Sequence, residues 1–166
     1  MAYIISNAQV GWQAIADTST TRNHALGQIV FATDPTYGGG EFIYLLGVAS
    51  TVVGNMVYYN TTTWQTTLTP NTANFAAPIA VAMSANVASQ YGWYQVSGNA
   101  VVKKSAVAVS PAAKMYQSGT TGRIMPTSAS GKQILGAKSA NLTTVTSTTS
   151  TVVVTISRPF MQGQIT

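Results

Sequence analysis

The chain has 166 residues, of which 46% are hydrophobic and only 7% are charged. Average soluble domains carry about 25% charged residues, and a chain this apolar is excluded from the intrinsically disordered class. Its length suits a single hydrophobic core, and its formal net charge of +5 is uneven, because all of its acids, Asp17, Asp34 and Glu41, lie in the first quarter of the chain.

The first 25 residues differ in character from the rest, since they contain few strong strand formers and a polar run, DTSTTRNH, that is typical of a loop. We therefore predict an irregular N-terminal arm over residues 1–25, followed by a single β domain over residues 26–166. The arm carries apolar side chains that must be covered, either by the core of the same molecule or by a neighbour. These side chains are Tyr3, Ile4, Ile5, Val10, Trp12 and Ile15.

From residue 28 onward, short runs rich in Val, Ile, Tyr and Thr alternate with clusters of Gly, Pro, Asn or Ser. The runs predict strands at residues 28–33, 41–48, 52–60, 78–84, 93–103, 114–117 and 151–158. The clusters predict turns at residues 34–40, 97–99, 118–122 and 128–131. Helix is expected at most as one turn over residues 85–90. The whole pattern predicts a mainly β fold, a compact β-barrel or β-sandwich of short antiparallel strands.

The residues needed for catalysis or metal binding are almost absent. The chain has no cysteine and one histidine, His24, which lies in the polar loop. It also lacks the GxSxG motif of a nucleophile elbow, which a serine hydrolase of the α/β type would need. Asp17 and Asp34 have the contexts of turn residues, whereas Glu41 opens an apolar strand, where an ion pair with an arginine and a catalytic role both stay open. The glycines of residues 38–40 lack the pattern of a phosphate-binding loop and predict a hairpin turn. We expect no enzymatic activity, no cofactor and no metal.

The basic residues are spread along the chain rather than clustered, apart from the adjacent Lys103 and Lys104. Specific nucleic-acid binders usually concentrate such residues on one face, so a nucleic-acid partner is not favoured. An acidic protein surface accounts for the charge imbalance equally well.

The aromatic residues offer a different kind of site. Trp93 and Tyr94 are consecutive in a predicted strand and so point to opposite faces, which predicts that at least one large ring points away from the core. An exposed ring of this kind would suit a sugar-binding platform. Trp12 and Trp64 are expected to anchor a protein interface, where Trp and Tyr often carry the binding energy.

Four segments, taken in order and spacing, resemble small proteins of tailed bacteriophages that are encoded with the head genes and described as capsid decoration, cement or head structural proteins. They are LGQIVFATDPTYGGGEFIYLLGVASTVVGNMVYYN from Leu26, IAVAMSANVASQYGWYQVSGNAVVK from Ile79, AAKMYQSGTTGRI from Ala112 and TVVVTISRPF from Thr151. The resemblance implies a compact β domain displayed on the outer capsid surface, often as a symmetric oligomer, with no catalytic residues.

Together these observations predict a non-enzymatic virion protein, made in the host cytoplasm, that decorates and stabilises the capsid by binding the major capsid protein. We expect a homo-oligomer, with a trimer preferred and a dimer as the alternative, and no membrane partner. A carbohydrate- or receptor-binding β module of a phage fibre or tail is the alternative function. Residues expected at a capsid or subunit interface are Tyr3, Ile5, Trp12, Arg22, Trp64, Lys103 and Lys104.

Overall fold

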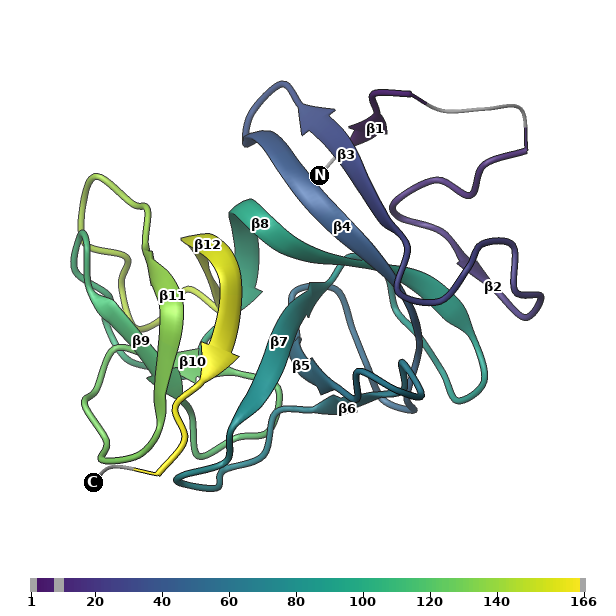
Figure 1. The fold of residues 1–166 in the computed structure, drawn as a ribbon. Helices are drawn as coiled ribbons and strands as arrows, with labels where there is room; N and C mark the ends of the chain where they lie inside the picture. Colours follow the sequence, from purple (N-terminus) through teal and green to yellow (C-terminus); the bar gives the residue numbers. More distant parts are fainter. Residues whose placement is uncertain (1–2, 8–10, 165–166) are drawn as a thin grey trace.

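The computed structural model describes residues 3–7 and 11–164, so the arm residue Val10 lies outside the described part. The described chain is built from strands and loops, with no helix (Figure 1). Its strands are β1 (Ile4–Ile5), β2 (Thr18–Ser19), β3 (Ile29–Asp34), β4 (Gly38–Leu46), β5 (Met56–Tyr59), β6 (Thr66–Leu68), β7 (Ala77–Ala82), β8 (Tyr91–Lys103), β9 (Lys114–Gln117), β10 (Ile124–Met125), β11 (Gln133–Ser139) and β12 (Thr151–Met161).

All of these strands belong to one antiparallel sheet, in the order β1-β3-β4-β8-β7-β12-β11-β9-β10. The short strand β2 pairs with β8, and the β5–β6 hairpin pairs through β5 with β7. The prediction of a mainly β, antiparallel fold is confirmed. The sheet is not closed into a barrel, so of the two predicted architectures the structure agrees with sandwich-like packing.

The long strand β8 has hydrophobic cores on both of its faces. Trp93 packs in one core with Phe42 and Tyr44 of β4, while Tyr94 packs in another with Ile43 of the same strand. Both rings are fully buried, so the prediction that one of them points away from the core is wrong. The sequence pattern could not reveal this, because a strand covered on both faces shows no alternation between apolar and polar residues.

The predicted turn at residues 97–99 is also absent, because β8 runs through it without a break. Gly98 has a φ of 98°, and a Cβ atom there would collide with the main-chain oxygen of Gly39. The glycine therefore allows the strand to bend and β4 to approach closely. It does not mark a turn, which was the interpretation from the sequence. Residues 93–103, which were predicted as a strand with a turn inside it, form part of one continuous strand.

The β3–β4 hairpin forms where it was predicted, but its turn is shorter. The Asp34 side-chain Oδ1 accepts hydrogen bonds from the main-chain N–H groups of Thr36 (2.8 Å) and Tyr37 (3.0 Å), which is the geometry of an Asx turn. Residues 38–40, the expected turn glycines, belong instead to β4 and pair with β3. The turn role predicted for Asp34 is confirmed.

The alternation predicted for the last strand is confirmed, because Val152, Val154 and Ile156 are buried and their neighbours are partly or fully exposed. These three residues belong to the largest core cluster, together with Met56 and Met115. A buried core of this kind is the main stabilising term for a chain without disulfides.

The N-terminal arm is irregular, as predicted, and lies on the core of its own molecule. Ile15 is 2% exposed, and the Tyr3 hydroxyl donates a 2.8 Å hydrogen bond to the main-chain oxygen of Asn99 in β8. In the arm, β1 pairs with the edge of β3, and β2 pairs with the first two residues of β8. The core of the same molecule therefore covers Tyr3 and Ile15, whereas Ile4 stays exposed.

Candidate docking surface

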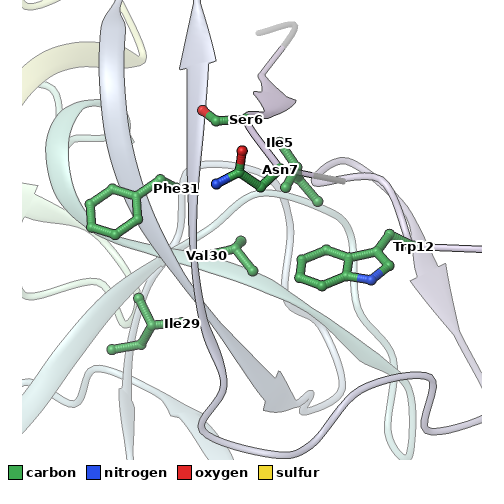
Figure 2. Close-up of a pocket in the computed structure, with 7 residues that line it drawn as sticks. All are labelled: Ile5, Ser6, Asn7, Trp12, Ile29, Val30 and Phe31. Carbon is green, nitrogen blue, oxygen red and sulfur yellow. The ribbon is translucent and has the colours of Figure 1, made fainter. Parts of the chain in front are cut away.

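A groove of about 210 Å³ runs between β3 and the N-terminal arm (Figure 2). Its walls are mainly apolar, with two polar side chains at the end formed by β1, and no charged residue lines it. The lining residues are Ile5, Ser6, Asn7, Trp12, Ile29, Val30 and Phe31.

Beside the groove, β1 pairs with the end of β3 that carries Thr33 and Ala32. The main-chain N–H of Ser6 donates a 2.9 Å hydrogen bond to the oxygen of Phe31, and pairing between the two described strands stops there. On its other side β3 is bonded to β4, where Gln28 O accepts from Tyr44 N at 2.9 Å. Antiparallel bonding alternates, so the main-chain groups of Ile29 face the groove, where no described residue pairs with them. Among the described residues, the pairing on this side of β3 thus ends at Phe31.

Large apolar side chains extend from the same edge onto the surface. Phe31 is 63% exposed, Ile29 is 39% exposed and Ile4 of β1 is 70% exposed. Ile29 and Phe31 alternate with the buried Val30, and Ile4 lies opposite Thr33, so all three point to the same face of the sheet. We call Ile4, Ile29 and Phe31, together with the groove beside them, the apolar edge. Contiguous exposed apolar groups of this kind mark protein-binding sites.

The Trp12 wall of the groove is held in place through His24. The rings of Trp12 and His24 are 5.1 Å apart, and His24 also contacts Tyr44 at 5.0 Å and Trp93 at 5.2 Å. The main-chain N–H of Gln13 donates to His24 Nε2 at 3.2 Å, so this nitrogen carries no proton. Burial lowers the pKa of His24, which keeps the ring neutral. The histidine therefore has a packing role.

The side chain of Gln13 fixes the arm to the core. Its Nε2 donates to the main-chain oxygens of Asp17 (2.9 Å) and Tyr91 (3.1 Å), and its Oε1 accepts from the hydroxyl of Tyr44 (2.8 Å) and from Asn23 (3.2 Å). Gln13 is 7% exposed, so these bonds are shielded from water. The Gln13 part of the arm is therefore a built part of the fold, next to the Trp12 wall of the groove.

The structure separates the residues predicted for an interface. Ile5 and Trp12 come together in the groove, whereas Arg22, Trp64 and Lys103 do not line it. Arg22 is exposed, Lys103 is half-buried at the end of β8, and Trp64 is half-buried and stacked on Tyr59 with the ring centres 6.3 Å apart.

Two of the predicted interface residues are corrected, because they are buried within the chain. Tyr3 is 8% exposed and packs edge-on against Phe42, while Lys104 is 1% exposed. The Lys104 Nζ donates to the main-chain oxygens of Val107 (2.9 Å) and Ser105 (3.3 Å), and burial lowers the pKa of this amine. Neither side chain is available to a partner.

Ile29 and Phe31, the β3 residues of the apolar edge, were not identified from the sequence as site residues. Their strand was predicted, and its sequence IVFATD alternates two large side chains with the smaller Val30 and Ala32. That alternation is a signal that the strand has two different faces. It does not indicate which face is covered, since all four residues are apolar.

Of the groups weighed for catalysis, Glu41, Asp34 and His24 make structural contacts. Glu41 pairs with Arg158 across a distance of 2.9 Å, which is one of the two roles that its strand position left open. No group of three or more metal-ligating side chains occurs among residues 3–7 and 11–164. Nor does the described part contain a helix long and apolar enough to cross a membrane.

The sugar-binding platform considered as an alternative for Trp93 is not supported by the position of this ring. The ring is fully buried, and its Nε1 donates a 3.0 Å hydrogen bond to the main-chain oxygen of Gln13. Tyr94 is equally buried, and burial raises the pKa of its hydroxyl to about 12. Neither ring can stack on a ligand at the surface.

Comparison with protein-family models gave no match, and comparisons with curated proteins and with solved structures also gave none.

Proposed function

We propose that this chain is a non-enzymatic structural protein of a tailed-phage particle that stabilises the capsid by binding the major capsid protein on its outer surface. The observation that carries the proposal is the apolar edge, where exposed Phe31, Ile29 and Ile4 border a groove without charged residues. Such a surface fits another protein, because binding removes large apolar side chains from water. The phage context comes from the sequence resemblance.

The shape of the edge favours an extended segment of the capsid protein as the occupant. The main-chain groups of Ile29 face the groove, and Trp12 and Val30 provide apolar contacts on its side. Addition of a strand to an open edge combines main-chain hydrogen bonds with side-chain pockets. The low proportion of charged residues, 7%, agrees with a protein whose surface works in contact with other proteins.

The proposal is tested with capsid shells prepared without this chain, to which purified protein is added and its occupancy measured by cryo-electron microscopy and sedimentation. Ordered density at equivalent shell positions is expected, which also gives the oligomeric state. Phe31→Asp should weaken binding at least tenfold, because a carboxylate would be buried in an apolar contact. Leu142→Asp is the matched control, since Leu142 is 94% exposed and lies outside the apolar edge.

Loss of shell binding in both variants would show that the apolar edge is not specific. Wild-type protein that does not bind shells, but binds a defined glycan on an array, would instead favour a carbohydrate-binding module of a fibre or tail. Protein that is absent from purified virions would refute the structural role.

A further inference from the structure

The outer face of the β8–β12–β11–β9 part of the sheet carries lysines without acidic partners. Lys103 lies near the end of β8, Lys138 on β11 and Lys114 on β9. The registers place them on one face: Lys103 opposes Thr151, Thr155 opposes Lys138, and Lys138 opposes Lys114. Residues directly opposite each other in an antiparallel sheet point to the same side. We call this surface the lysine face.

The lysine face is open, whereas the other side of the same strands is covered. Lys114 and Lys138 are exposed and Lys103 is half-buried, while Met115, Val102 and Val154 on the opposite side are buried in the largest core. No described residue forms an ion pair with any of the three lysines. The nearest acid along the face, Glu41, opposes Ser97 farther along β8 and is already paired with Arg158.

The pairing of Lys114 with Lys138 is unfavourable for an isolated molecule. Like charges placed directly opposite each other on neighbouring strands repel, and no carboxylate of the described chain relieves the repulsion. A carboxylate brought by a partner would turn this repulsion into attraction. Next to Lys138, the bulge at Gly136 leaves a hollow lined also by Thr155 and Ser157. The Thr155 hydroxyl already donates to Asn99 Oδ1 at 2.8 Å, whereas the Ser157 hydroxyl can donate to a carboxylate.

The centre of the face has the composition of a protein interface. Val101 and Val153 oppose each other there and are both partly exposed, and the lysines lie around them. Protein interfaces combine an apolar centre with a polar rim, whereas nucleic-acid interfaces are much more polar and more densely charged. The observations therefore favour an acidic protein surface over a nucleic acid.

We infer that the lysine face docks on an acidic protein surface, which, on the proposed function, belongs to a second capsid subunit. The apolar edge includes β1 at one end of the strand order, and the lysine face includes β9 near the other end (Figure 1). One molecule can therefore contact two neighbouring shell proteins by two different kinds of bond. A protein that joins neighbours in this way is what a cement requires, since two linked contacts hold more tightly than either alone.

The test compares two variants of equal net charge. Lys138→Gln removes one charge from the lysine face, and Lys132→Gln removes one elsewhere, since Lys132 bonds to Asn71 at 2.6 Å. Binding to capsid shells prepared without the chain is measured between low and high salt. The first variant is expected to bind at least tenfold more weakly at low salt, while the control stays within twofold of wild type.

Equal weakening in both variants would overturn the inference, because it would show an effect of net charge alone. Wild-type protein is also tested with a polyglutamate peptide and with duplex DNA, which do not depend on the capsid. Binding to polyglutamate that depends on Lys138 supports the lysine face even if shells are not bound and the proposed function fails. A preference for DNA with the same lysine dependence would replace the acidic protein by a nucleic acid.

Discussion

Replacing Gln13 with alanine should release the N-terminal arm from the core. The side chain makes four hydrogen bonds at 2.8 to 3.2 Å, to Asp17, Tyr91, Tyr44 and Asn23, in a site that is 7% exposed. A buried hydrogen bond contributes on the order of 1 kcal/mol, and a partner left unpaired costs about 1–3 kcal/mol. Because the arm can move and admit water to some of these partners, we expect Gln13→Ala to lower the free energy of unfolding by about 2–4 kcal/mol.

The assay is urea denaturation followed by tryptophan fluorescence, with hydrogen exchange of the arm as a second readout. Gln28→Ala is the matched control, because the Gln28 side chain is half-buried and makes no hydrogen bond to a described residue. A double-mutant cycle between Gln13→Ala and Tyr44→Phe should give a coupling of about 1 kcal/mol, since each change removes the same 2.8 Å bond. If Gln13→Ala and Gln28→Ala destabilise the protein equally, and the coupling is zero, then Gln13 does not hold the arm.

Three further outcomes are expected. Gly98→Ala should destabilise the protein by about 2 kcal/mol or more in the same assay, because the φ of 98° is strained for alanine and its Cβ would collide with the β4 main chain. Gly119→Ala, where the nearest atom would be 3.9 Å away, should have little effect, and equal losses would contradict this account. The lowered pKa of His24 means that the unfolded chain binds its proton more readily, so stability should fall as the pH drops from about 7 through the unfolded-state value near 6.5. His24→Gln should flatten this dependence, and a slope unchanged in the variant would assign it to another group. Lys104 should be the lysine least modified by an acetylating reagent in the native protein and should react on denaturation, as measured by mass spectrometry; fast native labelling would show that it is not buried.

The sequence alone determined the fold class and the strand at the end of the chain. Alternation of Val152, Val154 and Ile156 with more polar neighbours is a local pattern, and it predicts a strand with one buried face wherever that strand pairs. The turn role of Asp34 was equally local, because the Asx turn is made by the residue and its next neighbours. The strand β11 (Gln133–Ser139) escaped prediction, since Gly136 and Lys138 interrupt its apolar pattern at the bulge.

Only the tertiary structure decided which side chains reach the surface. Trp93 and Tyr94 are both buried because β8 lies between two cores, and Lys104 is buried although its neighbour Lys103 is partly exposed. In the same way, Phe31 is exposed because its side chain lies on the face of β3 opposite the buried Val30, and Lys114 meets Lys138 because β9 and β11 pair in that register. Such placements depend on strands far apart in the sequence, so a local pattern predicts that a strand forms but not what covers it.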